Sequence, residues 1–141
     1  MIIVIRIAGM VEIPDNVTET LFRMRLRRKY CAVLLKEDKE SLAVLKYVRN
    51  HVAYGQIDLE TLKELILKRG KLINKKKIDL TTANKIIEGL DKKGLEELGV
   101  KPFFRLAPPV KGIDTKIHFG RKQGVLGDNG KEINALVRRM L

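Results

Sequence analysis

The segment Ile2–Ile7, IIVIRI, constrains the fold more than any other stretch of this chain. A strand with one face in water alternates apolar and polar residues, whereas this run is apolar almost throughout. Its β-branched side chains favour extended backbone. We therefore predict a strand that is buried on both faces or nearly so.

Helices and strands alternate after this first strand. We expect a helix with Asn16 as its N-cap and Glu19 as the capping-box partner, ending in the basic cluster that begins at Arg25 and continues through Arg27, Arg28 and Lys29. Tyr30–Leu35 is a second predicted strand, Asp38 is positioned to cap a second helix, and His51–Ile57 is a third predicted strand. The order predicts an α+β unit: a β-α-β-α-β unit whose three-stranded sheet carries both helices on one face.

We predict that residues 59–141 form a mainly helical extension. Apolar spacing predicts a helix from Leu59 that stops at Gly70, another that Thr81 or Thr82 caps, and a last one over Lys131–Met140. Short strands are expected at residues 103–106 and 117–119, whereas GVLGDNG at 124–130 is expected to be a loop. We accordingly divide the chain into a core domain, 1–58, and an extension, 59–141.

Positive charge is the strongest indication of function. The chain of 141 residues has 29 Lys and Arg against 17 Asp and Glu, a net charge of +12. A small domain needs only about 2 to 8 net charges for solubility, and further charge makes the compact fold repel itself. The excess is concentrated in residues 59–141, with nineteen basic and ten acidic residues. The expected partner is a polyanion, with nucleic acid first and an anionic membrane second.

The segment 68–77 holds six basic residues and no acidic one. Large apolar side chains lie within this segment, at Leu72 and Ile73, and directly after it, at Ile78. A solvated linker would not be expected to contain such side chains. We predict that these three pack into a small core and hold the cations outward along one edge. Asp at position 73 should then damage the fold, whereas Glu at 75–77 should weaken polyanion binding alone.

Signs of catalysis are weak. His51 and His118 have no partners at metal-ligand spacing, and Cys31 lies in an apolar strand pattern typical of a core residue. The GVLGDNGK segment lacks the spacing of a phosphate-binding loop and its Ser or Thr. We expect no catalytic residue, metal or cofactor.

Several segments together resemble a known family: LFRMRLRRKYCAVLLKED, HVAYGQIDLETLKELILKRG, INKKKIDLT and KIHFGRKQGVLGDNGKEINALVRRM. They resemble the large-subunit ribosomal protein L-thirty family, in its long archaeal form akin to the eukaryotic protein called L-seven. The resemblance runs in order along nearly the whole chain. It implies an antiparallel three-stranded sheet with a C-terminal extension, no catalytic activity, and a structural role in the ribosome of the cytoplasm.

The resemblance also implies the partners, namely large-subunit ribosomal RNA and neighbouring ribosomal proteins, with no membrane and no small-molecule substrate. From charge, we expect the RNA-binding residues to be Arg23, Arg25, Arg27, Arg28, Lys29, Lys68, Arg69, Lys71, Asn74, Lys75, Lys76, Lys77, His118, Arg121, Lys122, Arg138 and Arg139. Two alternatives stay open at this point: a subunit of an RNA-processing enzyme, and an adaptor for an acidic protein.

Overall fold

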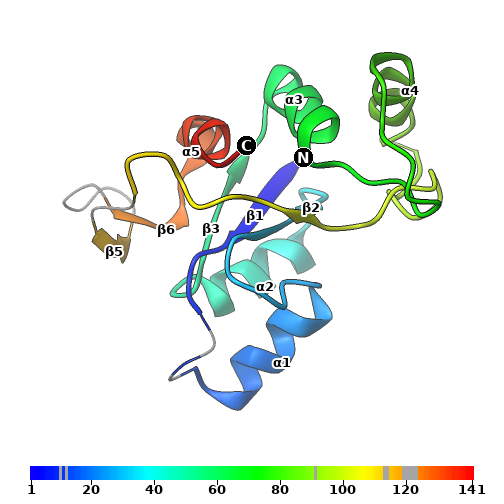
Figure 1. Ribbon diagram of the computed structural model, residues 1–141. Helices are drawn as coiled ribbons and strands as arrows, with labels where there is room; N and C mark the ends of the chain where they lie inside the picture. The colour runs from blue at the N-terminus through cyan, green and yellow to red at the C-terminus, as the bar shows by residue number, and fades with distance from the viewer. Residues whose placement is uncertain (10, 12, 91, 113–114, 119–123) are drawn as a thin grey trace.

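The computed structural model describes residues 1–141 except residues 10, 12, 91, 113–114 and 119–123, and it has a mixed α+β architecture (Figure 1). The strands are β1 (Ile2–Arg6), β2 (Cys31–Leu35), β3 (Val52–Gln56), β4 (Phe104–Arg105), β5 (Thr115–His118) and β6 (Gly124–Asp128). The helices are α1 (Asp15–Arg23), α2 (Lys39–Val48), α3 (Leu59–Arg69), α4 (Leu80–Leu90) and α5 (Ile133–Met140), with a 3-10 turn, η1, at Gly130–Glu132.

Strand β1 lies between β2 and β3 and is antiparallel to both. Val4 is opposite Val33 of β2 on one side and opposite Tyr54 of β3 on the other. Every residue of β1 is buried, as its uninterrupted β-branched run predicts. The predicted β-α-β-α-β unit with its three-stranded antiparallel sheet is confirmed.

The sheet is wider than predicted because the extension adds strands to both of its edges. β4 pairs antiparallel with β2, where Cys31 is opposite Arg105, and β6 pairs parallel with β3, where Ala53 is opposite Gly127. β5 continues beyond β6, giving the order β4-β2-β1-β3-β6-β5. The prediction that 124–130 is a loop was wrong for 124–128. This segment joins the sheet by pairing with β3, about seventy residues earlier in the chain, and that pairing leaves no local sequence pattern.

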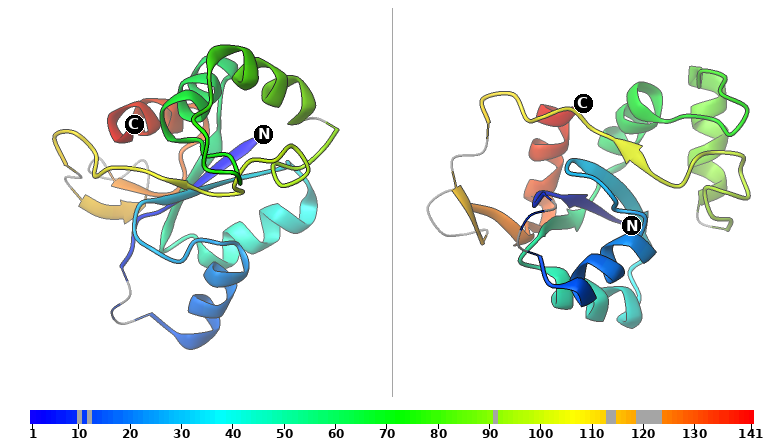
Figure 2. Two further views of the ribbon diagram at one scale, coloured as in Figure 1. Left: turned by 45° about the vertical axis from the view of Figure 1, so that its right-hand side comes forward. Right: turned by 60° about the horizontal axis from the view of Figure 1, so that its bottom comes forward.

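The two faces of the sheet are covered by different helices. α1 and α2 lie on one face, where Leu21 and Leu45 pack with Val4 and Val33. α3, α4 and α5 lie on the other, with α3 in contact with both of its neighbours and positioned between them (Figure 2). Their apolar side chains join those of Ile3, Ile5 and the other strand residues on that face in a second core. The two helices of the core unit therefore share one face, as predicted, and the extension covers the opposite face.

Several helix ends differ from prediction. Pro14 precedes α1, which starts at Asp15 without a side-chain cap; the predicted N-cap, Asn16, is already inside the helix. The helix therefore starts two residues earlier than predicted, directly after Pro14, which is itself extended with ψ of 142°. Asp38 caps α2 as predicted, its side chain accepting a hydrogen bond from the Ser41 amide at 2.7 Å.

Helix α4 is capped by an aspartate that comes before the predicted threonines. The side chain of Asp79 accepts a hydrogen bond from the Thr82 amide at 2.9 Å, so Thr81 and Thr82 lie within the first turn. Gly70 ends α3 as predicted, although with an extended backbone rather than the left-handed one usual at that position. A Cβ on Gly70 would collide with the carbonyl oxygen of Ile66.

Candidate nucleic-acid interface

The basic residues after α1 lie on a loop and not on the helix. α1 ends at Arg23, and Arg25 has a left-handed backbone with φ of 66°. Such a conformation costs a non-glycine residue about 1 kcal/mol or more, so the surrounding structure must hold it. The loop, residues 24–30, ends at Tyr30, which is also left-handed with φ of 65°. The prediction that the helix ends in these basic residues was therefore wrong.

Arg6, a buried arginine on β1, holds the loop in place by hydrogen bonds. The Arg6 guanidinium donates to the carbonyl oxygen of Leu26 at 2.7 Å, and the amide of Tyr30 donates to the carbonyl oxygen of Arg6 at 2.7 Å. The guanidinium also donates to the carbonyl oxygens of Ala8 and Gly9. Burial lowers the pKa of Arg6 from its ordinary value, and these carbonyl partners compensate for the water that the cation has lost.

The loop forms one wall of a hollow of about 500 Å³. We call it the arginine hollow, because four of its seven lining residues are arginines: Arg25, Arg27, Arg28, Cys31, Pro102, Phe103 and Arg105. The guanidinium carbon of Arg105 lies 5.9 Å from the centroid of the Phe103 ring, within the usual range of a cation–π contact. The hollow thus combines cations with an apolar and aromatic surface.

Two further hollows, of about 280 and 680 Å³, continue from the first. We call them the lysine hollows. Phe103 and Arg105 line both the arginine hollow and the smaller lysine hollow, and Lys68, Lys71 and Lys101 line both lysine hollows. The larger one is also lined by Lys75, Lys76 and Lys77. Shared lining joins the three into one basic groove, and no residue assigned to its lining is acidic.

Backbone pairing positions the lysine hollows. The amide of Lys101 donates to the carbonyl oxygen of Lys71 at 2.8 Å, and the amide of Ile73 donates to that of Gly99 at 2.9 Å. Lys75 has φ of 65°, the same left-handed conformation as Arg25. The segment is therefore a folded turn, as predicted, and it is held against the residues that lead into β4.

One of the three predicted apolar anchors of this segment is wrong. Ile78 is buried and only 8% exposed, and Leu72 is partly buried against the same core, but Ile73 is 58% exposed. The turn between positions 72 and 78 directs Ile73 outward, which its apolar character does not reveal. We therefore withdraw the expectation that Asp at position 73 damages the fold.

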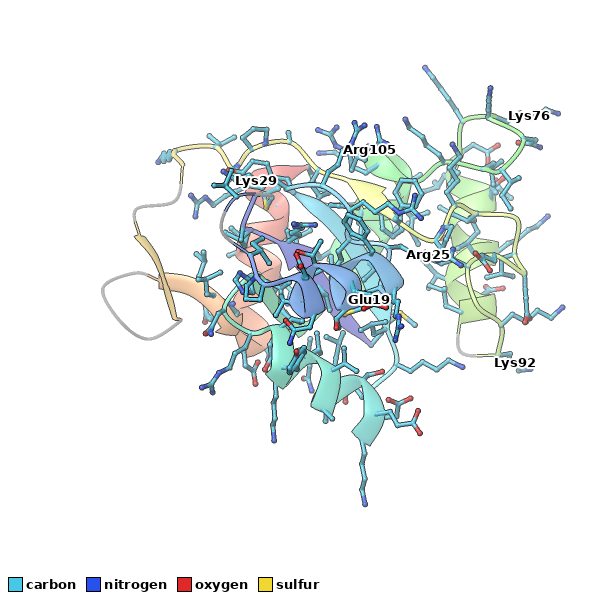
Figure 3. All side chains as sticks on the ribbon, turned by 90° about the horizontal axis from the view of Figure 1, so that it is seen from below. Glu19, Arg25, Lys29, Lys76, Lys92 and Arg105 are labelled. Atoms are coloured by element: carbon cyan, nitrogen blue, oxygen red, sulfur yellow. The ribbon has the colours of Figure 1, made fainter. Side chains whose placement is uncertain are left out.

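Nine of the predicted RNA-binding residues line the groove: Arg25, Arg27, Arg28, Lys68, Arg69, Lys71, Lys75, Lys76 and Lys77. Figure 3 shows Lys29, Arg105 and Lys76 along one edge of the molecule. The sequence reasoning missed Lys101, Phe103 and Arg105. The available signal was KPFFR, in which two cations flank an aromatic pair, whereas the sequence analysis predicts only a short strand at 103–106.

The other predicted residues lie elsewhere or have local partners. Arg23 pairs with Glu19 at 2.6 Å, Arg138 pairs with Glu60 at 3.6 Å, and Arg139 donates to the carbonyl oxygens of Val110 and Gly112. The Lys29 ammonium lies 5.0 Å from the centroid of the Tyr30 ring, and the Asn74 side chain accepts from the Lys76 amide, as a turn residue does. His118 is in β5, and Arg121 and Lys122 fall outside the described residues.

An acidic residue adjoins the groove from outside its lining. Glu96 forms an ion pair with Arg25, and both side chains are about half exposed. Such exposed pairs contribute only about 0–1 kcal/mol to stability. A phosphate with a better geometry for the guanidinium fork can therefore replace Glu96 at little cost.

The part of the chain that the structure describes offers no group of three His, Cys, Asp or Glu side chains placed to hold a metal ion. Cys31 is buried, and desolvation raises its pKa, so the thiolate form needed of a nucleophile is disfavoured. Within the same residues, no helix has the length and apolar character required to span a membrane.

The sheet, its two helical layers and the groove define a small α+β protein with a surface built for a polyanion. Residues 2–52 match the family described as ribosomal protein L30p/L7e. The chain is 38% identical to the large ribosomal subunit protein uL30 of Aeropyrum pernix, over 98% of this chain and 97% of that one. It is 36% identical to the protein of that name from Archaeoglobus fulgidus, over 99% of each chain, and 33% identical to that of Nanoarchaeum equitans. The chain belongs to the L30p/L7e family of ribosomal proteins.

Proposed function

We propose that this protein is a structural constituent of the large ribosomal subunit in the cytoplasm and that it binds ribosomal RNA along the basic groove. Membership of a ribosomal protein family supports a structural role rather than an enzymatic one. The observation that carries the binding mode is the continuity of the groove: three hollows share lining residues and bring together cations far apart in sequence, from Arg25 to Arg105.

The groove would act on RNA by neutralising phosphates and releasing their counterions. A-form RNA hides its base edges in a narrow major groove, so contacts to duplex segments should be to backbone and 2′-hydroxyl groups. Neutralising about six to ten phosphates would lower the affinity roughly 10³- to 10⁵-fold between about 50 and 200 mM salt. Neighbouring ribosomal proteins are the further partners we propose.

We also propose that residues 1–58 form the core unit and residues 59–141 an extension that supplies most of the groove. The family match to residues 2–52 supports this division. The extension contributes the whole lining of both lysine hollows, whereas the arginine hollow is also lined by the loop 24–30 and Cys31 of the core unit.

The test compares two triple variants of equal charge in binding to purified large-subunit ribosomal RNA. Lys75, Lys76 and Lys77 are exposed in the groove, and Lys36, Lys39 and Lys46 are exposed around and on α2. Changing the first three to Glu should weaken binding strongly and reduce the salt slope by about 2 to 3, because about one counterion is released per phosphate contact. The same change in the second three should have a much smaller effect.

Equal losses of RNA affinity in the two triple variants would contradict binding along the groove. Absence of the tagged protein from purified large subunits would contradict the ribosomal role. Cleavage of RNA by the purified chain would favour an RNA-processing enzyme instead, and a stoichiometric complex with an acidic protein after RNase treatment would favour an adaptor.

A further inference from the structure

The two ends of the basic groove are chemically different. The larger lysine hollow, at one end, is lined by six lysines and no arginine. The smaller one, between the two ends, combines three lysines with Arg69, Phe103 and Arg105. The arginine hollow is lined by four arginines and no lysine, and its other lining residues are Cys31, Pro102 and Phe103. A groove that served only to neutralise a phosphate backbone would have no need for this change in composition.

Arginine and lysine differ in what they can bind. Lysine is a compact, strongly hydrated point charge, which suits a phosphate in solvent. Arginine forms two parallel hydrogen bonds to phosphate and also stacks on flat π systems, because its guanidinium is planar and weakly hydrated. Single-stranded nucleotides present both groups together, with a phosphate on each side of a flat base.

The surface of the arginine hollow suits the flat base. Phe103 is half-buried and fixed by packing against the core beneath α1 and α2, so its ring needs little ordering on binding. Pro102 and the buried Cys31 adjoin it and are apolar. The volume of about 500 Å³ lies within the roughly 300–1,000 Å³ of pockets that enclose small organic ligands.

The loop that forms the facing wall is held in place before any ligand arrives. Arg6 bonds to Leu26 in the middle of the loop, and the left-handed backbone of Arg25 is held although it is unfavourable. Strained backbone of this kind is concentrated at ligand-binding sites. The arginines of the loop are therefore presented to the hollow on a fixed frame.

We propose that the arginine hollow receives a single unstacked nucleobase of the RNA, which stacks on Phe103 while Arg25, Arg27 and Arg28 bind the phosphates on either side of it. The lysine hollows then hold the adjoining backbone. This inference rests on the proposed function and adds to it the class of RNA element that is recognised: a bulge or loop with an extruded base, and not a continuous duplex.

The experiment uses two RNA hairpins with the same stem, one fully paired and one with a single 2-aminopurine bulge. The full-length protein should bind the bulged hairpin roughly 5- to 150-fold more tightly, which is the effect of stacking one base on an aromatic side chain. Because 2-aminopurine becomes more fluorescent when it leaves the RNA stack, its emission should rise on binding.

Two substitutions of Phe103 test whether its ring causes the preference for the bulged hairpin. Phe103→Leu keeps an apolar side chain of similar packing volume but lacks a flat ring, so it should abolish the preference for the bulge by lowering the affinity for the bulged hairpin far more than that for the paired hairpin. It should also leave the salt slope unchanged, since stacking releases no counterion. Phe103→Tyr should restore the preference. Lys76→Gln, in a lysine hollow, should weaken both hairpins equally and reduce the salt slope.

Equal binding of the two hairpins with a steep salt dependence would overturn the base pocket and leave the proposed function standing. A Phe103→Leu variant that weakens both hairpins by the same factor would also overturn it, because the ring would then be only structural. Failure of the protein to bind either hairpin or large-subunit RNA at low salt would overturn the proposed function and this inference together.

Discussion

Replacing Arg6 with methionine tests whether the buried guanidinium holds the loop 24–30 in place. Methionine has a similar length and suits a buried strand position, but it has no donor. The change leaves three carbonyl oxygens, of Leu26, Ala8 and Gly9, without the donor that they have in the structure. Water can reach the last two, whose bonds are only partly buried, but not the buried bond to Leu26.

The cost follows from these three bonds. A hydrogen bond to a charged group contributes about 1.5–3 kcal/mol, and a buried acceptor without a donor costs about 1–3 kcal/mol. We assign about 2 kcal/mol to the Leu26 bond and about 0.5–1 kcal/mol to each of the others. The free energy of unfolding should therefore fall by about 3 kcal/mol. For a chain of this length, that lowers the melting temperature by roughly 10 °C.

The assay is urea unfolding followed by circular dichroism, together with binding to large-subunit RNA. RNA affinity should fall as well, although Arg6 is buried and touches no solvent, because the loop arginines lose their support. Arg23→Met is the matched control: Arg23 is exposed on α1, where it forms an exposed ion pair with Glu19, so its loss should cost less than about 1 kcal/mol. An Arg6→Met protein with the stability and RNA affinity of the unaltered protein would refute the reasoning.

Three further predictions concern the second core, the groove and the sheet. Ile78→Asp should lower the free energy of unfolding by more than about 3 kcal/mol because a carboxylate would enter a core, whereas Ile73→Asp, at an exposed position, should change it by less than about 1 kcal/mol in urea unfolding. Glu96→Gln should raise RNA affinity about 2- to 5-fold in filter binding, since it releases Arg25 from an exposed ion pair. Gly55→Ala should lower stability by at least about 1–3 kcal/mol in thermal unfolding, because the new Cβ would collide with the η1 backbone and a side chain of α5.

Each of these predictions has a control. Glu97→Gln removes a neighbouring exposed charge and should leave RNA affinity nearly unchanged, and an equal gain at both glutamates would point to net charge in place of the Arg25 pair. Gly94→Ala introduces a Cβ with no atom within 4 Å and should be tolerated, so equal effects at Gly94 and Gly55 would contradict the packing argument. Equal damage from Asp at positions 73 and 78 would contradict the assignment of Ile73 to the surface.

The sequence is informative where the physical cause is local. The β-branched run of β1 predicts its burial on both faces, and Asp38 in front of an apolar repeat predicts the start of α2. The six cations at 68–77, interrupted by apolar residues, predict a folded basic surface, and all six line the groove.

Prediction fails where the cause is distant in the chain. β6 joins the sheet of the core unit because its Gly127 pairs with Ala53 of β3, and the segment GVLGD contains no feature that predicts this partner. The loop that contains Arg25 is held by the buried guanidinium of Arg6, which bonds to Leu26, twenty residues further along the chain. Arg105 belongs to the groove because β4 pairs with β2. Each depends on a contact between segments that only the complete fold brings together.

The strand order β4-β2-β1-β3-β6-β5 has a consequence for synthesis of the chain. The three strands made first occupy the middle of the sheet, and the strands that cover their edges come last. At about 5–20 residues per second, the open edge of β3 waits roughly 4 to 14 s between the completion of β3 and that of β6. Unpaired edges are sites where chains associate with one another. The nascent protein is therefore most vulnerable to aggregation while residues 57–128 are being made, and faster translation of that segment should increase the yield of folded protein.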